Sequence, residues 1–161
     1  MTYFDKSGEC CPKFDVKMFD AKTHVWKDKP FIRDYVVQLF HIPLNMGPVI
    51  MRMFGKIKRA DAAPKNEDFL LLAYDPSPWK SELYMTVTKK VPDAENVTLS
   101  GTFFSKVFDG PYDAVPKWIA EMEKLLASKG KKAKKYYVHY AYCPKCAKKY
   151  GHNYSAVFAE I

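Results

Sequence analysis

The chain has 161 residues, of which 48% are apolar and 16% aromatic, and its formal net charge is +8. This size and apolar content suit one compact domain, or two subdomains that share a core. No apolar run approaches the roughly 18 residues of a membrane span, and the first residues lack a signal-peptide pattern. We therefore expect a cytoplasmic protein without a membrane partner.

The positive charge is concentrated in two places. One is the stretch SKGKKAKK at 128–135, and the other is a set of basic residues spaced along 52–59. No helix-turn-helix or RNA-binding signature accompanies them, so a solvated loop and a solvated helix face are the simpler interpretation. A nucleic-acid partner is the weaker one.

The first half of the chain predicts an extension followed by four elements. Residues 1–30 are polar and irregular, whereas FIRDYVVQLFHI is β-branched and aromatic and predicts a strand over 31–42. A turn rich in Pro and Gly follows, and apolar residues at helical spacing then predict a helix over 46–60. Strands are expected over 69–75 and 81–89.

The second half repeats this order. A strand over 98–108, a helix over 113–128 that Gly130 ends, and strands over 136–142 and 153–160 are expected. AYDP at 73–76 corresponds to AYCP at 141–144, and SELY at 81–84 corresponds to SAVF at 155–158. We therefore predict an α+β fold of two pseudo-symmetric strand–helix–strand–strand units, about 31–92 and 97–161, with antiparallel sheet around a central ligand cleft.

The predicted strand around Glu82 has two different faces. Leu83 and Met85 point one way and suit a core, while Glu82 and Tyr84 point the other way. An aromatic wall with one carboxylate suits a cationic or flat aromatic ligand. The alternatives are that Glu82 faces solvent or pairs with a lysine, and that the tyrosines are half-buried sheet surface.

Other aromatic residues are candidates for the same wall. Tyr74, Tyr140 and Tyr142 all have even residue numbers in the predicted strands, so we expect their side chains to point to one face and to line this aromatic wall together. His41 ends the first predicted strand and could face the ligand, although a structural role is common for such a histidine. Trp118 lies at a helix edge and is more typical of a core residue.

The four cysteines suit reduced thiols or metal ligands better than disulfides in this compartment. Cys143 and Cys146 have the two-residue spacing of a zinc knuckle, and Cys10 or Cys11 together with His152 would complete a tetrahedral set. The alternative is a pair of thiols in a hairpin loop. A redox pair is disfavoured, because that motif usually opens a helix after a strand. We expect no cofactor, with a structural zinc only if these cysteines bind metal rather than remaining thiols.

The segment GTFFSKVFDGPYDAVPKWIAEMEKLLASKG resembles the GyrI-like small-molecule-binding domain family, in which a strand, a Gly-Pro-Tyr turn and an amphipathic helix recur in this order. The strand SELYMTV resembles the family strand that carries a central pocket glutamate, which here is Glu82. The resemblance covers residue 31 to the C-terminus. It implies a pseudo-symmetric fold around a pocket for cationic or planar molecules. Some members of that family are sensor domains, and the Cys-Cys-Pro and CPKC segments of this chain depart from their pattern.

The stand-alone branch of that family implies a hydrolase that opens cyclopropane-bearing, planar, apolar electrophiles. Glu82 would activate or orient water, and Tyr142 or Tyr140 would hydrogen-bond the developing oxyanion. One alternative is binding or sequestration of cationic aromatic drugs without chemistry, and a weaker one is a zinc-stabilised module that binds nucleic acid or protein. The expected ligand-binding residues are Tyr84, Tyr74, Tyr140, Phe158, His41 and Trp118.

Overall fold

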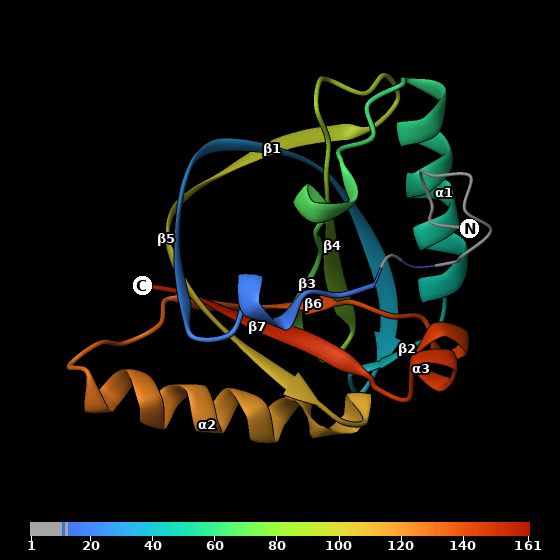
Figure 1. The fold of residues 1–161 in the computed structure, drawn as a ribbon. Coiled ribbons are helices and arrows are strands. Elements are labelled where there is room, and N and C mark those ends of the chain that lie inside the picture. Colours follow the sequence, from blue (N-terminus) through green and yellow to red (C-terminus); the bar gives the residue numbers. More distant parts are fainter. Residues whose placement is uncertain (1–10, 12) are drawn as a thin grey trace.

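The strands form one antiparallel sheet that closes into a barrel. The computed structural model describes residue 11 and residues 13–161. Six strands run in the order β1-β4-β3-β6-β7-β5, and β1 pairs with β5 to close the ring, while the short β2 pairs with β1 (Figure 1). The strands are β1 (Lys22–Leu39), β2 (Ile42–Pro43), β3 (Leu71–Ser77), β4 (Lys80–Thr86), β5 (Glu95–Asp109), β6 (Lys135–Tyr140) and β7 (Tyr154–Glu160).

Two long helices cover different sides of the barrel. These are α1 (Met46–Arg59) and α2 (Val115–Ser128), and a short third helix, α3 (Pro144–Tyr150), precedes β7 (Figure 1). Single 3-10 turns lie at Val16–Met18, Asn66–Asp68 and Tyr112–Ala114. None of the helices in the described part of the chain is long and apolar enough to cross a membrane.

The mixed α and β content and the antiparallel sheet are confirmed, but closure of the sheet was not predicted. It depends on β1, which begins at Lys22 although the sequence predicted a strand only from residue 31. Its first part pairs with β5 and its last part with β4. A bulge between Trp26 and Lys29, with Asp28 at a φ of 49°, reverses the strand alternation. Trp26 and Phe31 therefore both reach the interior cluster.

Apolar side chains form three layers around the barrel wall. The outer face of β1, β3 and β4 packs against α1 through Val49, Met53 and Ile57. The outer face of β5, β6 and β7 packs against α2, whose Trp118 stacks on Phe108 with ring centroids 5.4 Å apart. The barrel interior is filled mainly by aromatic residues, and its fully buried members include Phe31, Phe103 and Phe158. Interior packing therefore accounts for part of the high aromatic content of the chain.

The two halves of the chain supply their elements in the same order. The first half gives β1, α1 and the β3–β4 pair, and the second gives β5, α2 and the β6–β7 pair. The halves meet where β3 pairs with β6 and where β1 pairs with β5. A pseudo-twofold relation between the halves remains a prediction.

The CPKC motif lies in a helix, which corrects the prediction of a hairpin loop. Cys143 is the N-cap of α3, Pro144 is its first residue, and Gly151 ends it with a φ of 71°. Proline just inside a helix start and a left-handed glycine just beyond its end are both helix signals. The sequence pattern did not reveal the helix, because it has only seven residues.

The segment before β1 lies against the barrel. Phe19 is buried in the interior cluster and stacks on Phe14 with ring centroids 5.2 Å apart. The hydroxyl of Ser105 donates a 2.6 Å hydrogen bond to the carbonyl oxygen of Phe19. The N-terminal segment therefore contributes to the core.

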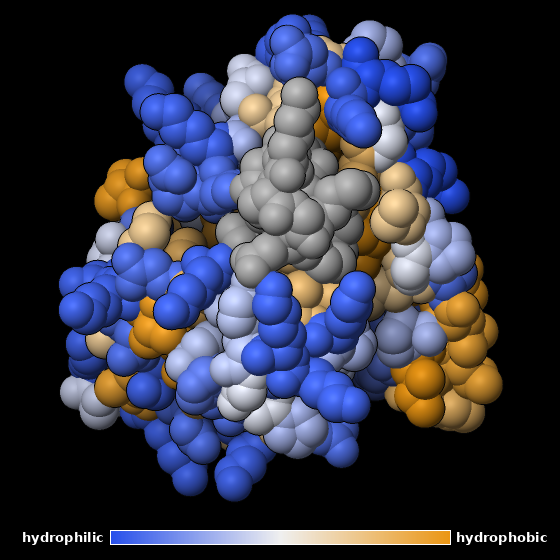
Figure 2. All heavy atoms as spheres, turned by 45° about the vertical axis from the view of Figure 1, so that its right-hand side comes forward, coloured by the Kyte–Doolittle hydropathy of each residue, from blue (hydrophilic) through white to orange (hydrophobic). Residues whose placement is uncertain are grey.

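Hydrophilic side chains cover most of the face seen in Figure 2, and apolar side chains gather at its lower right edge.

Candidate active site

Glu82 lies on the interior face of β4. Its neighbours directly across the ladder are Tyr35 of β1 and Tyr74 of β3, so the three side chains share one face of the sheet. Tyr84, two residues further along β4, belongs to the interior cluster, whereas Leu83 belongs to the cluster under α1. Strand alternation thus places a carboxylate among interior tyrosines.

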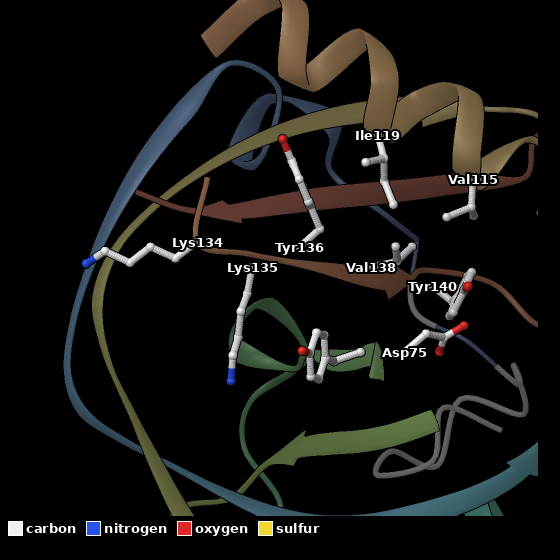
Figure 3. A pocket seen from close by; sticks show the side chains of 9 residues that line it. Asp75, Val115, Ile119, Lys134, Lys135, Tyr136, Val138 and Tyr140 are labelled. Carbon is white, nitrogen blue, oxygen red and sulfur yellow. The ribbon is translucent and has the colours of Figure 1, made fainter. Parts of the chain in front are cut away.

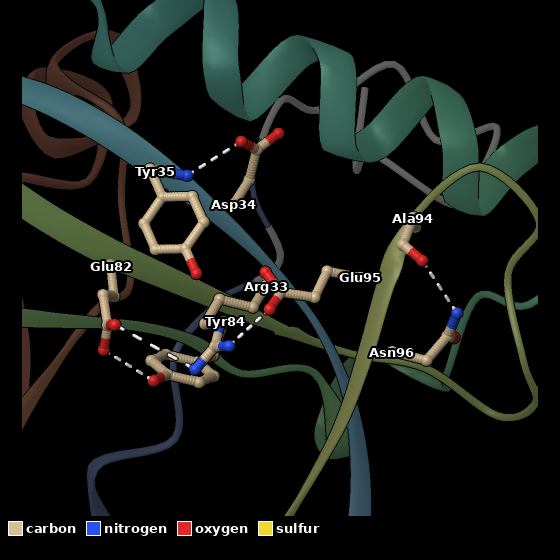
Figure 4. A network of polar contacts seen from close by, with 8 residues as sticks. All are labelled: Arg33, Asp34, Tyr35, Glu82, Tyr84, Ala94, Glu95 and Asn96. Carbon is tan, nitrogen blue, oxygen red and sulfur yellow. Dashed lines mark hydrogen bonds and ion pairs between the residues drawn. The ribbon is translucent and has the colours of Figure 1, made fainter.

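A polar network holds this carboxylate in place. The Tyr84 hydroxyl donates a 2.8 Å hydrogen bond to Glu82 Oε2. Arg33 lies between two carboxylates, with Nη1 4.0 Å from Glu82 Oε1 and Nη2 donating to Glu95 Oε1 (Figure 4). The Glu82 side chain is only 17% exposed, while that of Glu95 is 42% exposed. Glu82 is thus the sheltered end of the network and Glu95 the solvent end.

The network fixes the charge of its members. Burial raises the pKa of Tyr84 to about 12, so its hydroxyl is a neutral donor at physiological pH. The hydrogen bond from Arg33 lowers the pKa of Glu95, and the same bond raises the pKa of Arg33 further. A permanent cation therefore stands beside Glu82.

Arg33 also keeps one donor unused, and sequence reasoning missed this residue. Its Nε atom is buried and has no hydrogen-bond partner among the described residues. A buried unpaired N–H costs free energy, so it points to an acceptor that a ligand or a water supplies. Strand alternation along the segment FIRDY could have identified this residue, because it places Arg33 on the same strand face as Phe31 and Tyr35.

The aromatic wall beside Glu82 includes a residue that the sequence did not single out, Tyr137 of β6. Its ring centroid lies 5.6 Å from that of Tyr74 and 5.8 Å from that of Tyr84. Phe158, an expected ligand-binding residue, is buried in the same interior cluster. The structure thus brings Glu82, Tyr84, Tyr74 and Phe158 to one face.

Tyr140 lies on the opposite face of the sheet from Glu82, contrary to the expected common wall. Ala73 is opposite Val138 in the ladder, so the residues of β6 that share the face of Tyr74 are Tyr137 and His139. Tyr140 contacts both helix-covered clusters and meets the Tyr112 ring edge to face at 5.4 Å. Parity of residue numbers carries no information between two strands until their register is known.

Three further expected site residues also lie apart from Glu82. Tyr142 lies two residues beyond the end of β6, where strand alternation no longer applies, and its hydroxyl accepts a 2.8 Å hydrogen bond from the Phe14 N–H. Trp118 packs under α2. His41 is exposed, with Nδ1 3.4 Å from Asp75. These positions make Arg33, rather than Tyr142, the available donor near Glu82.

A pocket of about 320 Å³ shares Tyr74 with the aromatic wall but lies mainly between α2 and the outer face of β6, and Glu82, Tyr84 and Arg33 are not among its lining residues. It lies where β3 and β6 separate after only two paired positions. Val115 and Ile119 point into it from α2, and Asp75 lies beside Tyr140 at its other side (Figure 3). The residues lining it are Tyr74, Asp75, Val115, Ile119, Lys134, Lys135, Tyr136, Val138 and Tyr140. Its lining combines aromatic and aliphatic side chains with Asp75 and two lysines.

Three cysteines come together at the end of β6. The sulfur atoms of Cys11, Cys143 and Cys146 all lie within 4.8 Å of one another, a set that could bind a metal ion. The predicted ligand His152 is not among them, because its Nδ1 lies 2.7 Å from Asp109 Oδ2. Its ring also stacks on Tyr154. Cys10 lies outside the described residues.

Comparison with protein families gives a class for this chain. The profile of the family described as bacterial hydrolase matches residues 1–161, so the chain belongs to that family. Comparison with curated proteins gave no match. A sheltered carboxylate beside an arginine whose buried Nε–H has no acceptor among the described residues is consistent with hydrolytic chemistry.

Proposed function

We propose that this protein hydrolyses a planar, apolar electrophile in which a cyclopropane ring is conjugated to a carbonyl group. The hydrolase family supports the reaction class. The observation that carries the proposal is the Glu82 carboxylate, held by the Tyr84 hydroxyl on the aromatic interior face beside the unpaired Nε of Arg33. Flat rings suit a wall of tyrosines, and the conjugated carbonyl supplies the acceptor that Arg33 lacks.

The proposed step adds one water molecule to the substrate. Glu82 takes a proton from the water molecule while the oxygen of that water forms a bond to a cyclopropane carbon. The ring C–C bond breaks, and its electron pair moves through the conjugated system to the carbonyl oxygen, where the Arg33 Nε–H stabilises the developing negative charge. Glu82 then returns the proton to that oxygen through solvent. The Tyr84 hydrogen bond orients Glu82 throughout.

Binding without chemistry is the second candidate. In that function Glu82 is only a countercharge for a cationic aromatic drug. Arg33 already stands 4.0 Å from Glu82, and like charges repel, so a ligand cation gains less here than at a lone carboxylate. The network therefore favours a neutral electrophile. A module that binds nucleic acid or protein through the exposed lysines at 129–135 is the weakest of the three proposals.

We also propose that the two halves are copies of one GyrI-like unit around a shared site. Tyr84 and Phe158 occupy corresponding positions and both belong to the interior cluster, while Ser81 and Ser155 correspond and are both fully buried. Glu82 corresponds to Ala156. Under this relation only one half carries the carboxylate, which would make the site chemically asymmetric.

Turnover separates the first two candidates directly. The protein is incubated with a cyclopropane-bearing alkylator in water enriched in heavy oxygen, and products are analysed by mass spectrometry. We expect a ring-opened product that contains one labelled oxygen, formed faster than with heat-unfolded protein. Saturable binding of the compound with no ring-opened product above that control would refute hydrolysis and favour sequestration.

A further inference from the structure

Two segments that are distant in the sequence bring three cysteines to one point. Cys11 precedes the barrel, Cys143 follows β6, and Cys146 lies in the first turn of α3. Cys11 and Cys146 are each only 3% exposed. Thiolates bound to a tetrahedral zinc ion at about 2.3 Å are about 3.8 Å apart, so the observed sulfur separations of up to 4.8 Å need only small adjustments.

The surroundings of the sulfurs are those of a built site. The backbone N–H of Cys143 donates to Cys11 Sγ at 3.4 Å, a contact that helps to orient a metal-binding sulfur. The Tyr150 hydroxyl donates to the Cys11 carbonyl oxygen at 3.3 Å. Tyr142, Tyr150 and Tyr154 pack around the cluster. Cys11 is thus held by groups of the segment that carries the other two cysteines.

We propose that Cys11, Cys143 and Cys146 bind one structural zinc ion that fastens the N-terminal segment to the β6–β7 connection. Three thiolates leave the bound ion with a net charge of −1, which suits the lysines at 145, 148 and 149 of α3. A water molecule would take the fourth coordination position.

The ion would act on the barrel interior through the N-terminal segment. Phe14, three residues after Cys11, donates its N–H to the Tyr142 hydroxyl at 2.8 Å and stacks on Phe19. Phe19 in turn packs against Phe158 in the interior cluster, with ring centroids 5.9 Å apart. Zinc therefore holds in place the segment that closes the aromatic interior. This proposal does not depend on the reaction assigned to Glu82.

A disulfide is the competing chemistry for these thiols. The structure shows that the CPKC motif opens a helix after a strand, which is the setting of redox pairs. A disulfide joins only two of the three sulfurs, however, and a disulfide within the CPKC motif would not involve Cys11. The two chemistries differ in metal content and in mass.

The test measures bound metal in the full-length protein, purified with a reductant and without a chelator. We expect about one equivalent of zinc per chain by elemental analysis. Cobalt should replace it and give the thiolate charge-transfer absorption of a tetrahedral sulfur site. Substitution C11S or C146S should lower the metal content at least tenfold, by rough estimate. H152A is the matched control, and it should keep its full metal content.

Stability supplies a second measurement that does not depend on the variants folding. A strong chelator should lower the melting temperature of the parent protein by roughly 5 to 10 °C, and added zinc should restore it. The proposal is overturned if the reduced parent protein, supplied with zinc, takes up no metal and melts unchanged with chelator. A Cys143–Cys146 disulfide in metal-free protein, seen as a mass two hydrogens lower, would also overturn it.

Discussion

His139 should make the protein's stability strongly dependent on pH. This residue is 4% exposed on the interior side of β6, and its Nδ1 accepts a 3.0 Å hydrogen bond from the Leu71 N–H. The rings of Phe14, Phe19 and Phe69 lie 5.9 to 6.4 Å away. Burial in these surroundings lowers the pKa of His139 from 6.5 to about 4. The folded state therefore keeps this histidine neutral under physiological conditions.

The sign and size of the effect follow from that shift. Between pH 6.5 and about 4, His139 is protonated in the unfolded chain but stays neutral in the folded protein. The free energy of unfolding must then fall as pH falls through this window, and the effect is absent above it. From about pH 7.5 to about pH 4.5 the loss from this residue is roughly 2.5 kcal/mol, a large part of a typical domain's stability.

Urea unfolding of the parent and of His139→Asn, followed by tryptophan fluorescence at several pH values, measures this effect. The asparagine carbonyl can accept the Leu71 hydrogen bond but cannot titrate, so the variant should lose about 2.5 kcal/mol less than the parent over the same window. His24, whose pKa burial also lowers, leaves a smaller slope in both proteins. His41→Asn, at an exposed position, controls for the substitution itself. Equal pH slopes for the parent and the His139 variant would show that His139 is not buried as a neutral group.

Replacing Arg33 with Gln should reduce turnover of the cyclopropane substrate by roughly 100-fold, because it removes the donor to the oxyanion. Its cost in stability should be only about 1 kcal/mol, since the ion pair is partly exposed. Arg52→Gln breaks a carboxylate pair on the outer face of the same strand, so it should cost a similar amount of stability and leave turnover unchanged. Tyr84→Phe should lower kcat by roughly tenfold with KM little changed, because Glu82 loses one hydrogen bond. The stability that Glu95 gains from Arg33 is present above about pH 4.5 and is lost as pH falls through its lowered pKa, so acid denaturation should be less steep in the Arg33 variant.

The helices were the most predictable part of the fold. The expected ranges 46–60 and 113–128 differ by one or two residues from Met46–Arg59 and Val115–Ser128, because apolar residues at helical spacing must face a core. Helix α3 was missed, since seven residues give too little periodicity to detect. Closure of the barrel depends on which strands pair, and no local pattern encodes that choice.

Local alternation predicted the two faces of β4 around Glu82, because the side chains of one strand point to opposite faces in turn. It could not predict which residues of other strands join them. Tyr137 rather than Tyr140 faces Tyr74, and only the β3–β6 register decides this. Arg33 was missed because its partners, Glu82 and Glu95, lie on two other strands. Spacing in the sequence brought Cys143 and Cys146 together, but it could not exclude His152.

The most direct test of the proposed function compares Glu82→Gln with Glu95→Gln. Both variants remove one carboxylate from the same Arg33 network, but only Glu82 is sheltered on the interior face. Labelled-water turnover of the cyclopropane substrate is measured for each variant, with the melting temperature as the check on folding. We predict that Glu82→Gln loses at least 99% of turnover, by rough estimate, and that Glu95→Gln keeps most of it. A folded Glu82→Gln protein that turns over substrate like the parent would contradict the assignment of Glu82 as the catalytic base.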